Sequence, residues 1–280
     1  MKHTEAQFSG CEAVTIHTQS WLPEHARASV VIAHGLGEHG GRYAHVAQAL
    51  GAVGCAVHAL DHRGHGRSGG PRAVVDRWSH IVADFDQYIE RVRQASPSLP
   101  LFVLGHSMGG AIALGSALGR PEPMTGLILS GPAVDLEGAP PLARWLGKVL
   151  SVLAPRLGML AVDPSQISRD PQAVADYVAD PLNFHGKVPA RTIGEMVRFA
   201  EALPPRLPAL RLPLLALHGG ADKLAGPAGS RLVVERAASK DKTLKVYEGL
   251  YHEIFNERAE DRARVIGDLC AWVSERLRAR

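Results

Sequence analysis

The sequence predicts an α/β fold in which a mostly parallel sheet carries helices on both faces. Three observations support this prediction: short apolar, β-branched runs recur along the chain, longer helical patterns separate them, and the runs end in Gly, His or Asp. Strands that are apolar on both sides belong to sheets covered on each face. With 280 residues, 46% of them hydrophobic, the chain can bury one large α/β core.

Seven segments have the pattern of buried strands, and they span residues 12–18, 29–35, 55–61, 101–107, 126–132, 212–219 and 243–249. Between and after them, apolar residues recur every three or four positions, which indicates amphipathic helices. These predicted helices span residues 42–54, 76–96, 108–119, 228–239 and 256–280. Asn256 is the expected N-cap of the last one. On the 76–96 helix, we expect Asp84, Asp86 and Glu90 to form a solvated face.

The alternation of strands and helices stops between residues 135 and 208, where helical pieces rich in proline take its place. A stretch of this length is too long for a single crossover connection. We predict that it forms a helical cap over the carboxyl edge of the sheet, where ligands bind in open α/β folds. Residues 1–134 and 209–280 would then be the two parts of the core.

The first cap helix, expected over Leu142–Val162, is unusually apolar. Such a helix either packs wholly inside the protein or presents an apolar face to lipid or substrate. Burial against the core is the expected outcome, and transient contact with a membrane surface is the alternative.

The strongest functional signal is the segment from Gly105 to Gly109, Gly-His-Ser-Met-Gly, in which a buried strand runs directly into a helix. A Gly-x-Ser-x-Gly turn in this context is the nucleophile elbow of the α/β-hydrolase fold. The glycines allow the flanking backbone to approach the serine closely, while the serine itself is held in a strained conformation. We therefore predict an α/β-hydrolase fold with Ser107 as the nucleophile.

A serine hydroxyl reacts only when a base removes its proton, so a carboxylate and then a histidine are expected downstream. Asp222 follows one predicted strand and His252 follows the next, and both would emerge at the same sheet edge as Ser107. We predict that these three residues form a catalytic triad. His218 is expected to be a packed core histidine, and Glu253 does not lie at the turn expected for the acid.

The negative charge that develops on the substrate oxygen requires hydrogen-bond donors. The first predicted donor is the backbone N–H of Met108, the residue after the nucleophile. The second is the N–H of Leu36, because Gly35 and Gly37 let the backbone turn inwards there.

The segment around residues 58–65 offers an alternative, because His58, Asp61, His62 and His65 lie close together as in a metallohydrolase. The glycines that surround them favour a structural loop, with the polar side chains bonded to backbone. We therefore predict that the enzyme uses no metal and no other cofactor.

Composition excludes several classes of protein. The net charge of +3 arises from 31 basic and 28 acidic residues spread along the chain, which is not typical of nucleic-acid binding. Three widely spaced cysteines do not suggest a disulfide framework, and the first residues lack the pattern of a signal peptide. We expect a cytoplasmic protein that is peripheral to membranes if its cap contacts lipid. The oligomeric state stays open.

Several motifs together resemble the monoglyceride lipase family, within the cap-bearing α/β-hydrolases that also include lysophospholipases. They are HGLGEHGGRY, DHRGHGRSGG, GHSMGG, ISRDPQAVADYVADPL, GGADKLAGPAG and KDKTLKVYEGLYHE, in this order along nearly the whole chain. The resemblance implies the same triad and oxyanion hole, cap helices that lead a fatty acyl chain to the serine, and a glycerol end near Glu38 and Arg42. It also matches Tyr177 to a cap tyrosine. With a fatty acyl substrate, Leu146 and Leu150 of the apolar cap helix are predicted to bind the acyl chain.

Two positions depart from the mammalian pattern: Ala225 stands where those members have a cysteine, and Phe255 where they have a second histidine. The reaction that the resemblance implies is hydrolysis of a monoacylglycerol through an acyl-enzyme. A lysophospholipase or general carboxylesterase is the alternative among hydrolases. Outside the enzymes, the alternative is a non-catalytic α/β-hydrolase scaffold.

Overall fold

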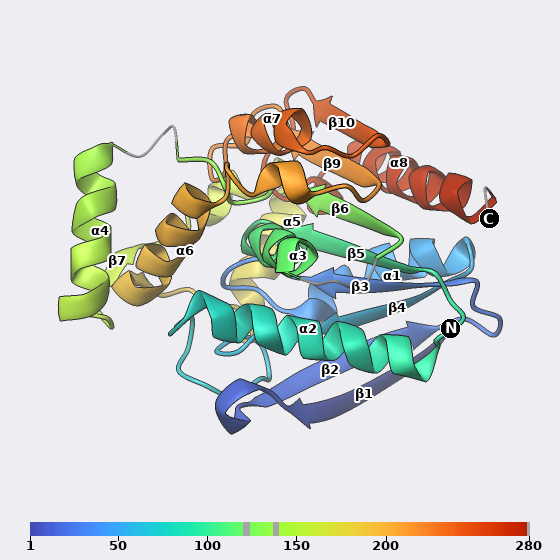
Figure 1. Ribbon diagram of the computed structural model, residues 1–280, viewed down its shortest axis with the longest axis horizontal. Helices are drawn as coiled ribbons and strands as arrows, with labels where there is room; N and C mark the ends of the chain where they lie inside the picture. Colours follow the sequence, from blue (N-terminus) through green and yellow to red (C-terminus); the bar gives the residue numbers. More distant parts are fainter. Residues whose placement is uncertain (120–123, 137–139, 279–280) are drawn as a thin grey trace.

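A central sheet with helices on both faces dominates the computed structural model, which describes residues 1–119, 124–136 and 140–278 (Figure 1). Its strands follow the order β1-β2-β4-β3-β5-β6-β9-β10. Neighbours pair in parallel along β4, β3, β5, β6, β9 and β10, whereas β2 pairs antiparallel with both β1 and β4. The predicted mostly parallel sheet is therefore confirmed. The bounds are β1 Lys2–Ser9, β2 Thr15–Leu22, β3 Ala28–Ala33, β4 Cys55–Leu60, β5 Leu101–His106, β6 Gly126–Ser130, β9 Leu214–Gly219 and β10 Lys242–Tyr247.

The burial of each strand explains which strands the sequence pattern revealed. β3, β5, β6 and β9 are buried along their whole length, so nearly every position in them is apolar. β1 lies at the edge of the sheet, and Phe8 is its one buried residue. No apolar run therefore marked β1, and it was not predicted.

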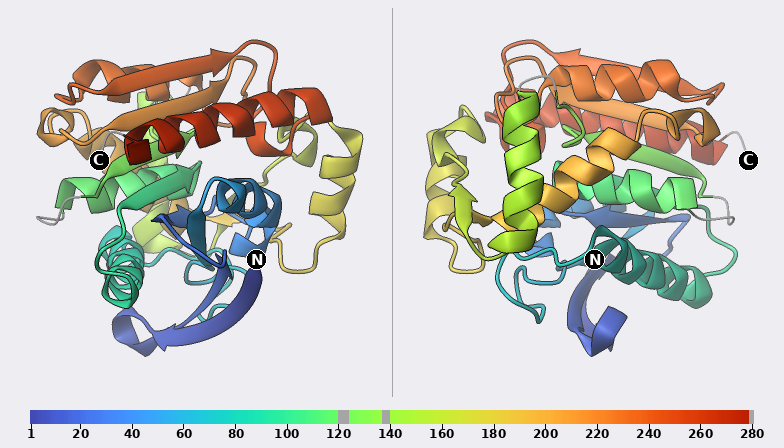
Figure 2. Two further views of the ribbon diagram at one scale, coloured as in Figure 1. Left: turned by 90° about the vertical axis from the view of Figure 1, so that its right-hand side faces the viewer. Right: turned by 60° about the vertical axis from the view of Figure 1, so that its left-hand side comes forward.

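Helices cover both faces of the sheet and create two hydrophobic cores (Figures 1 and 2). One core includes Val31 of β3 together with side chains of α2, α3 and α7. The other includes the next residue, Ile32, together with side chains of α1 and α8. Successive side chains of a strand point to opposite faces, so a single strand contributes to both cores. The bounds are α1 Ala44–Ala52, α2 Trp78–Ala95, α3 Met108–Gly119, α7 Pro227–Arg236 and α8 Ala259–Arg278.

The chain between β6 and β9 forms a separate group of short elements beside the carboxyl ends of the strands (Figure 2). They are α4 Pro141–Leu153, β7 Gly158–Leu160, η3 Pro164–Gln166, α5 Pro171–Ala179, β8 Val188–Pro189, α6 Ala190–Ala202 and η4 Leu207–Ala209. The division into core 1–134, cap 135–208 and core 209–280 stays a prediction. Residues 137–139 of the predicted cap lie outside the described residues.

Two expectations about the first cap helix are wrong. The helix predicted over Leu142–Val162 ends at Leu153, and the short strand β7 follows, because Pro155 lacks the N–H that a helix needs. The helix is also not buried against the core: its buried residues are Gly147 and Ser151, while Trp145 and Leu153 are 56% and 77% exposed. It packs with its small residues against α6 and keeps large apolar side chains outside.

The expectation that Asp84 belongs to a solvated face of α2 is also wrong. Its carboxylate is completely buried, and it accepts hydrogen bonds from Arg63 Nε at 2.7 Å and from the backbone N–H of Cys11 at 2.6 Å. Asp84 therefore joins α2 to the turn between β1 and β2. None of the described helices combines the length and the hydropathy that crossing a bilayer requires.

Candidate active site

Ser107 lies on the sharp turn between β5 and α3, with a positive φ of 54°. L-residues rarely adopt this left-handed conformation, so the surrounding backbone must enforce it. A Cβ on Gly105 would collide with the carbonyl oxygen of Gly109, and a Cβ on Gly109 would collide with that of Ala33. The two glycines thus allow the strand and helix to come together and raise Ser107 into the pocket.

Asp222 and His252 form a buried hydrogen-bonded pair, with His252 Nδ1 2.7 Å from Asp222 Oδ2. The other carboxylate oxygen, Oδ1, accepts hydrogen bonds from the N–H groups of Leu224 and Ala225, at 2.8 and 3.0 Å. His218 Nε2 lies 3.2 Å from Oδ2. The loop after β9 therefore holds Asp222 in one orientation, and Asp222 in turn orients the imidazole of His252.

The electrostatics of the Asp222–His252 pair suit a general base. Burial alone would raise the pKa of Asp222, but hydrogen bonds from His218 and His252 outweigh it and lower that pKa. Burial alone would lower the pKa of His252, but the hydrogen bond and charge of Asp222 outweigh it and raise that pKa, with further contributions from Glu253 and Glu38. The carboxylate thus stabilises an imidazolium that forms beside Ser107.

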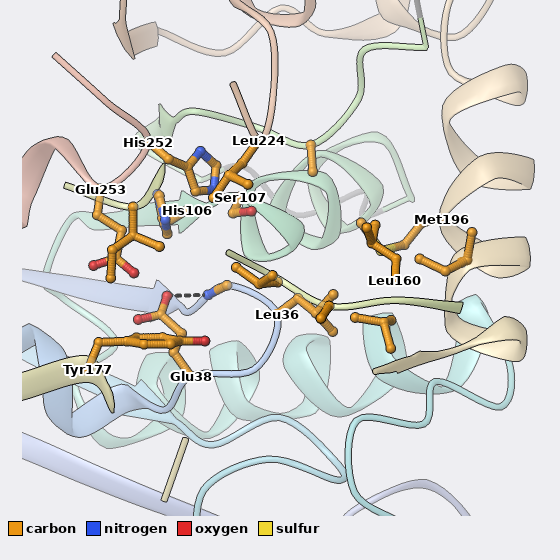
Figure 3. Close-up of a pocket in the computed structure, with 17 residues that line it drawn as sticks. Leu36, Glu38, His106, Ser107, Leu160, Tyr177, Met196, Leu224, His252 and Glu253 are labelled. Atoms are coloured by element: carbon orange, nitrogen blue, oxygen red, sulfur yellow. Dashed lines mark hydrogen bonds between the residues drawn. The ribbon is translucent and has the colours of Figure 1, made fainter. Parts of the chain in front are cut away.

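Ser107 and His252 open into one pocket, which has a polar side and an apolar side (Figure 3). Glu38, Tyr177 and Glu253 lie on one side of the serine in this view, whereas Leu160 and Met196 lie on the other. The lining residues are Gly35, Leu36, Glu38, His106, Ser107, Ala133, Leu160, Ala161, Val162, Ile167, Tyr177, Val188, Ile193, Met196, Leu224, His252 and Glu253. A substrate with a polar group on one side of its reacting bond and an apolar chain on the other would fit this pocket, with that bond at the serine.

An ionic network borders the polar side. Arg42 donates from Nη1 to Glu38 at 2.7 Å, and it binds Glu253 through Nη1 and Nη2 at 2.8 and 2.7 Å. The second oxygen of Glu38 accepts hydrogen bonds from Gly35 N at 2.6 Å and from Tyr43 Oη at 2.8 Å. Glu38 thus positions the loop that carries Leu36, the predicted oxyanion donor.

The two predicted oxyanion donors are placed near Ser107 in different ways. Met108 follows it in the chain, and the loop that carries Leu36 approaches it in space. Met108 is the first residue of α3, and the first N–H groups of a helix have no acceptor inside that helix. Leu36 lines the pocket, and its neighbour Gly35 is so close to the serine that an added Cβ would lie 3.2 Å from Ser107 Cβ. The loop is also tied to the inserted segment, since Phe184 N donates to Gly37 O at 2.8 Å.

Comparison with known proteins identifies the family. Residues 24–259 match the family model described as serine aminopeptidase, S33. The chain is 45% identical to the monoacylglycerol lipase of Mycolicibacterium smegmatis, over 98% of each chain. It is 38% identical to human monoglyceride lipase, over 91% of this chain and 86% of that one. The solved structure of a Paleococcus ferrophilus monoacylglycerol lipase matches with a TM-score of 0.81 and 30% identity, covering 99% of this chain and 100% of that chain.

This chain belongs to the monoacylglycerol lipase family. It is thus a carboxylic ester hydrolase with the α/β-hydrolase fold, and the resemblance found in its motifs is confirmed. The description of the family model names a peptidase, whereas the curated relatives above are named for ester cleavage.

Three of the predicted substrate residues do not line the pocket: Arg42, which lies behind Glu38 and Glu253, and the two leucines of α4. Leu146 and Leu150 lie on α4, and neither is among the residues that line the cavity. The reason is that α4 runs alongside α6 instead of crossing above Ser107. The apolar wall comes instead from β7 and the residues after it, and from Ile193 and Met196 of α6.

The site also contains residues that the sequence did not single out. His218 is a buried core histidine as expected, but it also contacts Asp222. Glu253 lies immediately after His252, and its bidentate pairing with Arg42 could not be inferred because the two residues are 211 positions apart. An acidic residue next to the predicted catalytic histidine can be recognised in the sequence. The sequence does not show which basic residue pairs with it.

In the histidine-rich segment around residues 58–65, Asp61 and His58 make structural contacts, whereas the ring nitrogens of His62 have no hydrogen-bond partner among the residues that the structure describes. Asp61 accepts hydrogen bonds from Gly40 N and Arg67 N, at 2.8 and 2.9 Å, and His58 Nδ1 lies 2.9 Å from Ser20 Oγ. These contacts favour the structural interpretation over the metallohydrolase one.

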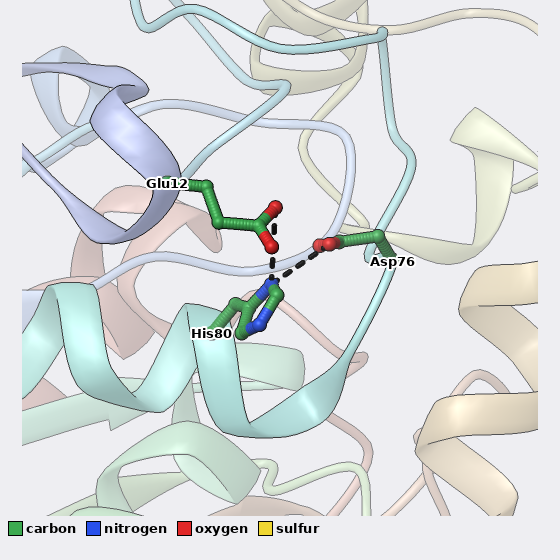
Figure 4. A group of neighbouring side chains, drawn as sticks. All are labelled: Glu12, Asp76 and His80. Atoms are coloured by element: carbon green, nitrogen blue, oxygen red, sulfur yellow. Dashed lines mark hydrogen bonds and ion pairs between the residues drawn. The ribbon is translucent and has the colours of Figure 1, made fainter.

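Within the described ranges, the group of side chains with the spacing of metal ligands is a different one (Figure 4): Glu12, Asp76 and His80. His80 Nδ1 already lies 2.8 Å from Asp76 Oδ2, and the other oxygen of Asp76 pairs with Arg63 at 3.3 Å. These contacts account for the group as a set of ion pairs at the surface.

Proposed function

We propose that this enzyme hydrolyses monoacylglycerols to a fatty acid and glycerol, with Ser107 as nucleophile, His252 as general base and Asp222 as the acid that orients it. The observation that carries the proposal is the Asp222–His252 pair, buried in the same pocket as a strained serine on a nucleophile elbow. The relatives named above, which are monoacylglycerol lipases, support the choice of substrate.

The reaction follows from the arrangement of these groups. His252 takes the proton of Ser107 as the serine oxygen attacks the ester carbonyl. The N–H groups of Leu36 and Met108 stabilise the oxyanion, and His252 then gives its proton to the departing glycerol oxygen. Water, activated by the same histidine, hydrolyses the acyl-enzyme and releases the fatty acid.

The two sides of the pocket orient the substrate. The acyl chain lies along the apolar side, where each buried methylene contributes about 0.8 kcal/mol of binding free energy. The glycerol lies on the polar side, near Glu38, Arg42 and Tyr177. The guanidinium carbon of Arg42 lies 5.0 Å from the centre of the Tyr177 ring, and this contact fixes the tyrosine that closes that side.

The exposed face of α4 is the part of the enzyme that binds the lipid surface containing the substrate. Leu142, Trp145 and Leu153 are 67%, 56% and 77% exposed, whereas Lys148 of the same helix is paired with Glu201 of α6 at 2.8 Å. An exposed apolar patch of this kind suits transient binding to a membrane surface, where the substrate resides.

The proposal is tested with Ser107→Ala. The variant should lose hydrolysis of decanoylglycerol and labelling by a fluorophosphonate probe, while its circular dichroism and thermal melting stay those of the wild type, since one hydroxyl is lost. Ser79→Ala, which removes an exposed serine of α2, is the matched control and should retain both activities. Residual turnover within about tenfold of wild type in Ser107→Ala would contradict the assignment.

A further inference from the structure

The alcohol side of the pocket contains two carboxylates for one guanidinium. Glu38 and Glu253 are 3% and 6% exposed, and both are held by Arg42, whose side chain is 11% exposed. The charge of Arg42 balances one carboxylate and leaves a second negative charge in this buried wall. Figure 3 shows both carboxylates on the same side of Ser107, and both residues line the pocket.

Glu38 and Arg42 are both ionised. Burial alone would raise the pKa of Glu38, but the charge of Arg42, followed by the interactions with His106 and His34 and the N–H of Gly35, lowers it to about 2. Burial opposes the charge of Arg42 too, yet Glu253 and Glu38 raise the pKa of Arg42 well above its ordinary value. Glu253 makes the two parallel bonds to the guanidinium that are characteristic of a carboxylate, and it accepts a third from Asn256 Nδ2 at 2.9 Å.

Arg42 is not available to bind an anionic head group. Three of its hydrogen bonds are directed to carboxylate oxygens, two on Glu253 and one on Glu38, and the Tyr177 ring lies against its guanidinium. A phosphate that approached this arginine would have to displace a carboxylate from it. The arginine therefore neutralises part of the wall but offers no anion site.

The two carboxylates differ in what they do. Glu38 is tied to the loop of Leu36 through Gly35 N and to Tyr43 Oη, so it positions the loop. Glu253 follows His252 directly and lines the pocket, and its bonds go to Arg42 and Asn256. Replacing Glu253 therefore removes the excess charge without cutting the bonds that shape the oxyanion loop.

We propose that Glu253 makes the alcohol side of the pocket selective for uncharged head groups, by leaving a net negative charge there. This side of the pocket binds hydroxyl groups, because they donate hydrogen bonds to carboxylates. It repels phosphate and carboxylate head groups, because they carry the same charge. This inference rests on the proposed function and specifies its substrate class: neutral polyol esters, and not the anionic lysophospholipids that share the same acyl chain.

The test compares two esters that differ in charge and hardly in shape. They are 3-O-decanoylglycerate, which carries a carboxylate, and 3-O-decanoylglyceramide, which carries a neutral carboxamide at the same position. Both are assayed as monomers, below their micelle concentrations, so that the charge of an interface does not contribute. Decanoylglycerol and decanoyl glycerol 3-phosphate form a second pair with natural head groups. The measured quantity is the ratio of kcat/KM for the neutral ester to that for the anionic ester.

The wild-type enzyme should prefer the neutral ester by about tenfold or more, as expected for like charges in a partly buried site. In Glu253→Gln, the preference should fall to about threefold or less. Glu248→Gln removes an exposed carboxylate from the same loop, and it should retain the wild-type ratio. The wild-type ratio requires no variant, so it tests the proposal even if Glu253→Gln folds poorly.

Equal kcat/KM for both esters in the wild type would overturn the proposal. A Glu253→Gln enzyme that loses rate on both esters in equal proportion would also overturn it, since a structural role alone moves both rates together. Wild-type enzyme that cleaves none of the four esters would instead refute the proposed function itself.

Discussion

At the scale of single residues, the carboxylate of Asp222 illustrates how the site is held. Its four contacts come from the backbone of Leu224 and Ala225 and from the rings of His218 and His252. The positions of Asp222 and His252 after successive strands were sufficient to predict the pair. The contribution of His218 was not predictable, because a histidine inside a strand has the same pattern whether or not its ring meets a carboxylate.

The raised pKa of His252 predicts the pH dependence of the reaction. Only the neutral imidazole can accept the proton of Ser107, so kcat/KM should fall as pH drops through the raised pKa of His252. In Asp222→Asn, the charge that raises this pKa is absent. We expect the acid limb of the pH profile to move to lower pH and the plateau rate to fall by about 10⁴-fold.

The measurement is a pH profile of kcat/KM on a soluble decanoyl ester. Asp163→Asn, at an exposed position, is the control and should reproduce the wild-type profile. An acid limb that stays in place in Asp222→Asn would show that Asp222 does not set the charge state of His252.

At the scale of elements, α4 and α6 divide the roles that the sequence analysis gave to a single helix. α6 lines the pocket with Ile193 and Met196 and is anchored to the core through Thr192, which accepts from Val75 N at 2.9 Å and donates to Ala73 O at 2.6 Å. α4 packs on the outer side of α6. A hydrophobic pattern reports that a face is apolar, but not whether substrate, solvent or core lies against it.

The apolar wall predicts which helix determines acyl-chain preference. Met196→Asp should reduce kcat/KM for a monomeric dodecanoyl ester at least about tenfold more than for a butyrate ester, since several methylenes at about 0.8 kcal/mol each lose their apolar contact. Leu146→Asp is the matched control on α4 and should leave the ratio of the two esters unchanged. The opposite result would place the acyl chain along α4.

The exposed face of α4 predicts membrane binding. Trp145→Ser combined with Leu153→Ser should weaken cosedimentation with vesicles that contain anionic lipid, because about 1.5–3 kcal/mol of burial is lost for each large apolar side chain. Hydrolysis of monomeric butyrate esters should not change, since neither residue lines the pocket. The control is Val178→Ser on α5, which is 53% exposed outside this face. Unaltered vesicle binding in the double variant would exclude α4 as the contact.

At the scale of the whole molecule, a buried ion pair connects the antiparallel edge of the sheet to the core. Asp84 of α2 binds Arg63, and Arg63 Nη2 donates to the carbonyl of Cys11 at 2.9 Å, in the turn between β1 and β2. Asp84 also accepts from the N–H of Cys11. The pair thus joins three segments that are far apart in the sequence.

This ion pair predicts a large effect on stability. Asp84→Ala leaves the charge of Arg63 and the N–H of Cys11 buried without the carboxylate, and should lower the free energy of unfolding by about 3–5 kcal/mol. Glu90→Ala on the same helix removes a partner of the half-exposed Arg93 and should cost at most about 1 kcal/mol. Urea denaturation measures both. A change below about 1 kcal/mol in Asp84→Ala would mean that water replaces the lost partner.

The sequence by itself determined the class of the sheet, each described strand of the central sheet except β1, and the order of the predicted triad. Buried parallel strands are apolar at nearly every position, and the elbow around Ser107 needs glycines at two fixed positions, so both leave a direct trace in the residues. Only the tertiary structure decided that α4 faces outwards, that Asp84 is buried, and that Glu253 pairs with Arg42 across 211 positions. Each of these features depends on which residues pack against one another in the folded chain. The local pattern of polar and apolar residues does not indicate the packing partner.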